Sequence, residues 1–127
     1  MRVSRLLGDA GIDIESVSVR VGLPDLDGVD VRPAPPWMRR LWKGRVRAMT
    51  IRDRIFVEPE LLDRRPDTIA PLILHELVHV RQWRSGAVRF LTRYGADYLM
   101  GRLRRRSHAE AYAGIRFEVE ARHVAGV

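Results

Sequence analysis

Residues 67–84 constrain the fold most, because their pattern distinguishes two faces of one helix. His75, Glu76 and His79 have the spacing H-E-x-x-H. At about 100° per residue, the two histidines lie about 40° apart on a helix, with Glu76 about 60° beyond His79. Apolar residues fall on the far side of the same wheel: Ile73, Leu77 and Val80. The pattern predicts an amphipathic helix that carries chemistry on one face and packs against a core with the other.

The ends of this helix carry residues with known preferences. Asp67 follows Pro66 and is expected to be the N-cap, and Pro71 falls in the first turn, where its missing N–H costs little. Ser85 and Gly86 are expected to stop the helix. We therefore predict a helix over residues 67–84.

The flanking sequence predicts further elements. Upstream, we expect a short helix at 1–10, a strand at 16–21 where Val alternates with small polar residues, a Pro- and Gly-rich loop at 22–36, and a helical turn at 37–43. A hairpin is expected from 45–51 and 55–57, turning near 52–54. Downstream, one helix is expected at 87–105, with one stripe formed by Val88, Leu91, Tyr94 and Tyr98. Another is expected at 109–125, broken near Gly114.

Strands come before helices in this order, which is typical of the α+β class. With 127 residues, the chain has the length of a single domain. We expect a short antiparallel sheet packed on the helix at 67–84 and on the two helices that follow it. Residues 1–44 would supply the N-terminal strand and the loop region, and residues 45–125 the core that carries the chemistry.

Composition limits the kinds of site that the chain can form. The chain has no Cys, so disulfides and thiolate ligands are excluded, and a metal ion would be held by His, Asp or Glu. No apolar run approaches the about 20 residues that a membrane-spanning helix needs. The first ten residues are basic but lack the apolar stretch of a secretory signal. These features predict a cytoplasmic protein.

The third metal ligand is sought downstream of the histidine pair. A metzincin would have Gly and His at the positions occupied by Gln82 and Ser85, so that class is excluded. The carboxylate candidates on later helices are Asp97, Glu110, Glu118 and Glu120. Glu118 is favoured because it shares a helix face with small residues that permit close packing, namely Gly114, Ala121 and Ala125. Glu120 and Glu110 remain alternatives as the third ligand. Glu118 could also form a salt bridge with an arginine and not bind a metal ion at all.

In these features the sequence resembles the gluzincin class of zinc metallopeptidases, in particular the small single-domain minimal gluzincins. The resemblance covers residues 45–125 and rests on four segments: 49–57, 74–83, 107–112 and 117–121. It implies a zincin-like fold with His75, His79 and Glu118 as zinc ligands and Glu76 as the general base. Thermolysin-like gluzincins have an Asp four residues after the ligand Glu, whereas this chain has Arg122 there. Support for the ligands must therefore come from other residues.

The expected reaction is peptide hydrolysis by a zinc-activated water, with Glu76 taking its proton and passing it to the leaving amine. A second donor is needed for the oxyanion. Tyr112 is our first choice because a phenol donates without a change in charge, and the alternatives are His108, Arg116 and His123. We expect the substrate to be an extended peptide that pairs with an edge strand within residues 45–57.

Two other functions are consistent with the sequence. The chain could be a metal-bound module with little or no proteolytic activity. It could also bind nucleic acid or anionic membrane, because its net charge is +7 and all but one of its 23 basic residues are Arg. The basic cluster at 102–106, together with the aromatic and apolar residues of the preceding helix, is the candidate contact with an anionic surface.

Overall fold

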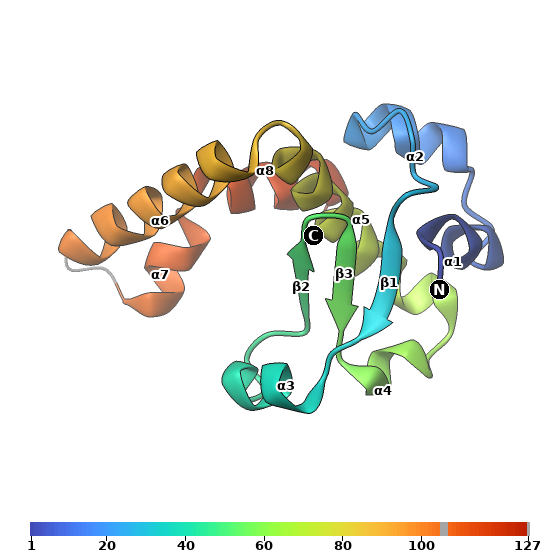
Figure 1. The fold of residues 1–127 in the computed structure, drawn as a ribbon, viewed down its shortest axis with the longest axis horizontal. Helices are drawn as coiled ribbons and strands as arrows, with labels where there is room; N and C mark the ends of the chain where they lie inside the picture. Colours follow the sequence, from blue (N-terminus) through green and yellow to red (C-terminus); the bar gives the residue numbers. More distant parts are fainter. Residues whose placement is uncertain (105–106, 127) are drawn as a thin grey trace.

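The computed structural model describes residues 1–104 and 107–126. Within these residues the chain is a mixed α and β structure with a small sheet (Figure 1). The helices are α1 (Val3–Asp9), α2 (Ile14–Val21), α3 (Pro36–Trp42), α4 (Pro59–Leu62), α5 (Pro66–Arg84), α6 (Ala87–Leu103), α7 (His108–Ala113) and α8 (Arg116–Ala125). The strands are β1 (Asp30–Pro33), β2 (Ala48–Ile51) and β3 (Arg54–Val57). The predicted α+β class is confirmed at this level.

The sheet has the order β1-β3-β2. The predicted hairpin is confirmed: β2 and β3 are antiparallel, with Ile51 opposite Arg54 across the turn. The sheet is nevertheless mixed, because β1 pairs in parallel with β3. The loop predicted at 22–36 from its Pro and Gly content is therefore wrong at Asp30–Pro33, which form β1. Pro33 is tolerated because β1 lies at an edge of the sheet.

The strand predicted at 16–21 is wrong, because these residues belong to helix α2. Val17 and Val21, which are four residues apart, are buried, whereas Val19 between them is 84% exposed. The burial therefore follows the helical period and not the alternation of a strand. Asp13 caps the helix by accepting a hydrogen bond from the backbone N–H of Glu15 at 3.3 Å.

Helix α5 lies at the centre of the fold and packs against α1, α2, α6, α8 and β2. The predicted apolar face is confirmed, since Ile73, Leu77 and Val80 are completely buried. The predicted cap is wrong by two residues: Arg65 is the N-cap, and Pro66 takes the first helical position, which its fixed φ suits. The predicted stop at Ser85 is confirmed.

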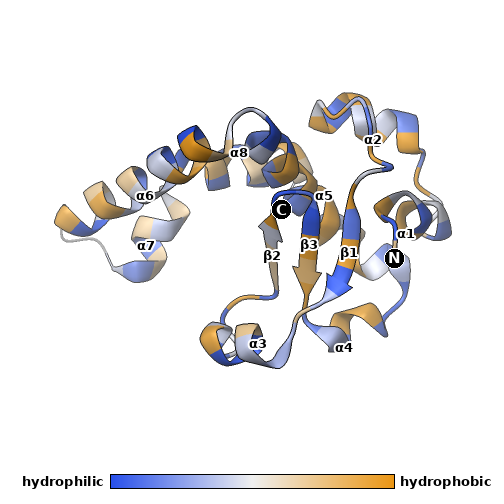
Figure 2. Cartoon of the chain, in the orientation of Figure 1, coloured by the Kyte–Doolittle hydropathy of each residue, from blue (hydrophilic) through white to orange (hydrophobic). Residues whose placement is uncertain are grey.

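Helix α6 extends away from the sheet and is joined to the rest of the molecule through α5, α7 and α8 (Figure 1). The predicted break near Gly114 is confirmed, because α7 ends at Ala113 and α8 begins at Arg116. The stripe predicted for α6 is partly buried at Tyr94 and Tyr98 only. Val88 and Leu91 are exposed, whereas Phe90 and Gly101 are buried. Apolar residues recur along the whole of α6 (Figure 2). None of the helices among the described residues has the length and hydropathy of a membrane span.

Gly101 on α6 provides a test of the packing between α6 and α7. A Cβ at this position would lie 3.0 Å from both Cα and Cβ of Ala111, whereas a Cβ at Gly95 on the same helix meets nothing within 4 Å. We expect Gly101→Gln to lower the free energy of unfolding by about 1–3 kcal/mol, because the two helices must separate. The matched change Gly95→Gln should raise it by up to about 1 kcal/mol through helix propensity. Urea denaturation measures both, and equal effects would contradict the close packing.

Candidate metal centre

Helix α5 presents the two histidines on the side opposite its buried apolar face. The His79 residue is 6% exposed, and the His75 side chain is 14% exposed. Their rings lie with centroids 5.0 Å apart in an edge-to-face arrangement. The spacing of four residues along the helix therefore places both imidazoles at one site, as the sequence predicts.

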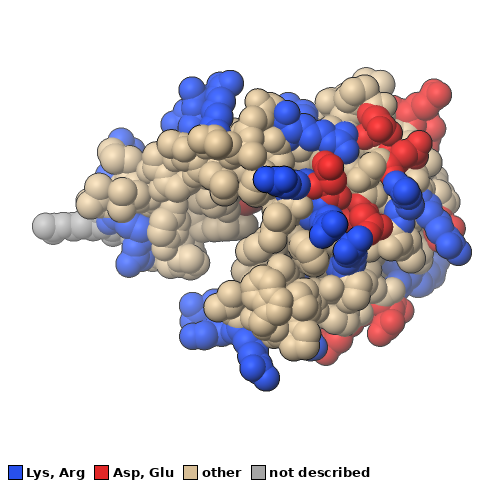
Figure 3. Space-filling view, in the orientation of Figure 1, with Lys and Arg blue, Asp and Glu red and all other residues tan. Residues whose placement is uncertain are grey.

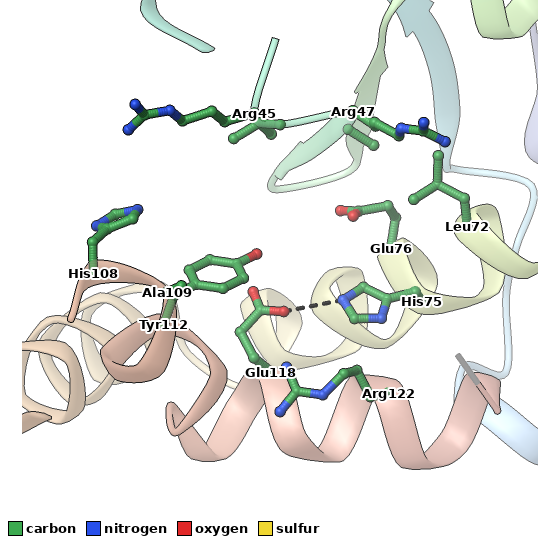
Figure 4. Close-up of a pocket in the computed structure, with 12 residues that line it drawn as sticks. Arg45, Arg47, Leu72, His75, Glu76, His108, Ala109, Tyr112, Glu118 and Arg122 are labelled. Carbon is green, nitrogen blue, oxygen red and sulfur yellow. Dashed lines mark hydrogen bonds and ion pairs between the residues drawn. The ribbon is translucent and has the colours of Figure 1, made fainter. Parts of the chain in front are cut away.

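Helix α8 brings Glu118 to the same site. Ala121 and Ala125 are buried on the same helix face, and Glu118 itself is only 3% exposed. Its Oε2 lies 3.0 Å from Nε2 of His75, and its Oε1 lies 3.1 Å from Nε2 of His79. Figure 4 shows the contact between Glu118 and His75 from the side of the cavity. The three residues could hold a metal ion, since one potential ligand atom from each lies within 4.8 Å of the others.

The other carboxylates considered as ligands have different partners. Glu120 pairs with Arg81, and also accepts a hydrogen bond from Gln82 Nε2 at 2.9 Å. Glu110 accepts a hydrogen bond from Ser107 Oγ at 2.9 Å and is exposed. Asp97 binds Arg116. The structure therefore brings only Glu118, of the four candidates, to the histidine pair.

Gln82 supports His79 from the next turn of α5. Its side-chain nitrogen donates to the carbonyl of Phe117 at 3.1 Å and to Glu120, which fixes the orientation of the amide. Its oxygen, Oε1, is therefore the atom that lies 2.7 Å from Nδ1 of His79. Because an amide oxygen only accepts, Nδ1 carries the proton and Nε2 is the nitrogen directed at the site. This is the tautomer that a metal-ligating histidine requires, so the donor set fits a metal ion.

Tyr94 of α6 supports the third candidate ligand. Its hydroxyl donates to Oε1 of Glu118 at 2.9 Å. Burial, with the nearby Tyr112 and Glu118, raises the pKa of Tyr94, so this hydroxyl keeps its proton. Hydrogen bonds with Gln82 and Tyr94 therefore support His79 and Glu118.

The environment shifts the pKa values of the charged groups. Burial would raise the pKa of Glu118, but hydrogen bonds with His75 and His79 outweigh it and hold the pKa well below its usual range. Burial would lower the pKa of His79, but the contact with Glu118 raises it. Burial raises the pKa of Glu76. The two buried carboxylates, Glu76 and Glu118, are thus shifted in opposite directions by their surroundings.

Glu76 lies beside the candidate ligands but binds a different partner. It is 5% exposed, and its Oε2 accepts a hydrogen bond from Thr50 Oγ of β2 at 2.7 Å. Oε1 has no hydrogen bond to another described residue. In Figure 4 the carboxylate of Glu76 points into the cavity that also contains Tyr112 and Glu118.

The site opens into a cleft with two arms, seen as a hollow in the surface in Figure 3. Both arms share Val46, Ala48, Glu76, Tyr112 and Glu118. The first arm has a volume of about 500 Å³ and adds the basic side chains of Arg45, Arg47, Arg122 and His108. The second has a volume of about 410 Å³ and adds mainly apolar side chains, among them Met49, Ile51, Trp83, Phe90 and Leu91.

Among the four predicted oxyanion donors, Tyr112 lies in both arms and is 41% exposed. Burial raises its pKa, which keeps the phenol protonated. His108 lines the first arm, but its Nδ1 is hydrogen-bonded to Tyr98 at 2.8 Å. Arg116 is engaged with Asp97, and His123 is an exposed residue that lines neither arm. The structure therefore brings Tyr112 to the site and leaves Arg116 and His123 away from it.

Sequence reasoning missed Gln82, Tyr94 and Thr50 as parts of the site. A signal was present for Gln82, which lies three residues after His79 on the same helix face. Thr50 lies within the predicted hairpin, and its side chain is directed at Glu76 of α5. No local signal could have linked Tyr94 to Glu118, because the two are 24 residues apart and on different helices.

Comparison with family models, with curated proteins and with solved structures found no match to this chain. What the site does is therefore inferred from its own residues.

Metal content tests the donor set directly. We expect protein purified without a His tag and supplied with zinc to hold close to one ion per chain, measured by inductively coupled plasma mass spectrometry. His79→Ala and Glu118→Gln should each lose most of it, because each removes one of three ligands. Glu110→Gln is the matched control and should retain the ion. Retention of zinc by Glu118→Gln would exclude Glu118 as a ligand.

The supporting hydrogen bonds are tested by zinc affinity. Gln82→Leu and Tyr94→Phe keep all three candidate ligands but remove the contacts with His79 Nδ1 and Glu118 Oε1. We expect each to weaken zinc binding by about 10–100-fold in competition with a chromophoric chelator. Tyr98 lies on the same helix as Tyr94, and its hydroxyl is bonded to His108 of α7, so Tyr98→Phe is the control. Unchanged affinity in both variants would contradict the supporting role.

Proposed function

We propose that this chain is a zinc-dependent metallopeptidase of the gluzincin kind, with a small zincin-like fold. The observation that carries the proposal is that a set of candidate metal ligands from two helices lies beside a separate buried carboxylate. His75 and His79 of α5 and Glu118 of α8 converge with Nε2–Oε distances of 3.0 and 3.1 Å. Glu76 lies beside them, buried and outside this donor set, on the wall of the same cleft.

His75, His79 and Glu118 would hold the ion. Zinc in a site with three protein ligands supplies Lewis acidity, which lowers the pKa of water and polarises a carbonyl group. Two neutral imidazoles and one carboxylate leave the bound ion with a net positive charge, which suits this role. Gln82 and Tyr94 keep the donors oriented.

Glu76 is the proposed general base. Thr50 occupies its Oε2, so Oε1 is the atom that accepts a proton from the attacking water and returns it to the leaving amine. Burial raises the pKa of Glu76, and a raised pKa makes a carboxylate a better proton acceptor near neutral pH. The Tyr112 hydroxyl is the proposed donor to the oxyanion, since it is protonated and lines the cleft beside Glu76.

The edge strand β2 is the proposed backbone partner of the substrate. The backbone N–H of Glu58 donates to the carbonyl of Arg47. The backbone N–H and C=O groups of the odd-numbered residues of this segment are therefore directed at β3. Thr50 O accepts from Trp83 Nε1 instead, which confirms that the even-numbered residues face away from β3. The N–H and C=O of Ala48 and the N–H of Thr50 are therefore directed at the cleft and can pair with an extended peptide.

A peptide antiparallel to β2 would have a defined polarity in the cleft. Its N-terminal part would lie beside Ile51 and Trp83 in the apolar arm, and its C-terminal part beside Arg45 and Arg47. The first arm contains three arginines, Arg45, Arg47 and Arg122. Within the described residues, none of them forms an ion pair. We therefore propose substrates with apolar residues before the scissile bond and acidic residues after it.

The Glu76→Gln change tests the reaction itself. It preserves the candidate ligands but removes the base, so we expect hydrolysis of a fluorogenic peptide library to fall by about 10²–10⁴-fold. Zinc content should not change. Zinc binding without any hydrolysis by the unaltered protein would support the inert metal-bound module instead. Hydrolysis that survives Glu76→Gln would exclude the proposed base.

Charge substitutions test the substrate polarity. We expect Arg45→Gln combined with Arg47→Gln to lower kcat/KM by about threefold to tenfold for peptides with acidic residues after the scissile bond. Neutral peptides should be unaffected. Arg5→Gln on α1, which is also exposed, is the matched control. A loss that is equal for acidic and neutral peptides would contradict the role of the arginines.

A further inference from the structure

Helix α6 leaves a large apolar surface exposed. Val88 is 81% exposed, Leu91 is 55%, Leu99 is 57% and Leu103 is 67%. At about 100° per residue these four side chains fall within about 120° of the helical wheel, with Gly95 among them. We call Val88, Leu91, Gly95, Leu99 and Leu103 the outer stripe; Leu91 lies at its border, where it also lines the apolar arm of the cleft. Single exposed apolar residues are ordinary, but a continuous stripe along a whole helix indicates a binding surface.

The rest of the molecule cannot cover the outer stripe, because the opposite face of α6 is already used. Phe90 packs on Trp83 and on Phe117, with ring centroids 5.0 Å apart in each case. Asp97 binds Arg116 through two hydrogen bonds of 2.7 and 2.8 Å. Gly101 lies against Ala111 of α7. These contacts fix the rotation of α6 about its axis and keep the stripe on the outside.

Arginines accompany the outer stripe. Arg89 and Arg93 border it along one side, and Arg102 and Arg104 lie at the C-terminal end of the helix. All four are exposed, and none of them forms an ion pair within residues 1–104 and 107–126. Arg105 and Arg106, which the sequence analysis grouped with Arg102 and Arg104, lie outside the described residues. In the view of Figure 3, the surface over α6 shows basic side chains beside residues without charge.

We propose that the outer stripe of α6 rests on an anionic lipid bilayer, with its leucines in the boundary of the acyl chains and its arginines among the phosphate headgroups. An apolar stripe beside basic residues is the pattern of helices that lie in a membrane interface. Long arginine side chains reach the headgroups while their stems stay on the apolar surface. Anionic lipid also suits the net charge of +7.

The charges favour a bilayer over other occupants of the stripe. A second copy of the chain packed on α6 would bring two sets of arginines together, which is electrostatically unfavourable. A nucleic acid would neutralise the arginines but leave the leucines in water. A bilayer satisfies both kinds of side chain at once.

Vesicle binding tests the proposal and does not depend on metal or on hydrolysis. The full chain is sedimented with vesicles of phosphatidylcholine alone or mixed with phosphatidylglycerol. We expect binding to the mixed vesicles only. Leu99→Gln combined with Leu103→Gln should weaken vesicle binding by about tenfold or more, because two leucine side chains no longer enter the acyl region of the bilayer. Arg89→Gln and Arg102→Gln should each weaken it by about fivefold.

Two controls separate the outer stripe from a general effect of charge or exposure. Val19→Gln replaces an apolar side chain that is 84% exposed on α2, and Arg5→Gln removes a charge from α1. Both should bind vesicles as the unaltered protein does. Binding that Leu99→Gln with Leu103→Gln leaves unchanged, or equal binding to neutral vesicles, would overturn the proposal. A stable dimer that the same double change dissociates would assign the stripe to a second copy and would also overturn it.

The absence of Cys from the chain allows a second, independent readout. An environment-sensitive fluorophore can be attached at one site at a time after Leu99→Cys or Val19→Cys. We expect the emission to shift to the blue on addition of anionic vesicles when the label is at residue 99 but not when it is at residue 19. Equal shifts, or none at residue 99, would show that the outer stripe does not enter the bilayer.

Discussion

Glu118 is a buried carboxylate, and much of the arrangement of helices follows from the need to satisfy it. A charge at 3% exposure is strongly destabilising unless it is hydrogen-bonded or paired. Glu118 receives contacts from His75 and His79 of α5 and from Tyr94 of α6. Three helices, α5, α6 and α8, are therefore tied to one carboxylate. Small residues on α8 allow this, since Ala121 is completely buried.

The same cluster explains how the site and the core share helix α5. Ile73, Leu77 and Val80 are buried on one side, and Phe90 covers His79 on the other with a centroid distance of 6.3 Å. Helical rotation then separates Glu76 from the two histidines and directs it towards β2, where Thr50 binds it. The helix, the strand and α8 thus enclose a cleft in which a base and a set of ligands are adjacent but distinct. This separation is what the proposed hydrolysis requires.

Local patterns were enough to predict the parts of the structure that depend on one element. The helix of His75 and His79, the hairpin, the break near Gly114 and the choice of Glu118 over Glu120 all follow from periodicity or from the residues on one helix face. Predictions failed where a partner distant in sequence decided the outcome. Residues 16–21 alternate like a strand, but packing against the rest of the core buries Val17 and Val21 on one helix face. Residues 30–33 read as a loop until β3 offers them a parallel neighbour.

The sequence by itself determined that one helix would carry two histidines and a glutamate beside an apolar face, because side-chain direction on a helix depends only on spacing. Only the tertiary structure decided which residues support these groups. Gln82 is held by Phe117 and Glu120, and Tyr94 reaches Glu118 from another helix. It also decided that the outer stripe of α6 stays exposed, since Phe90, Asp97 and Gly101 fix the rotation of that helix. Such contacts join residues far apart in the chain, and their geometry exists only once the helices have packed.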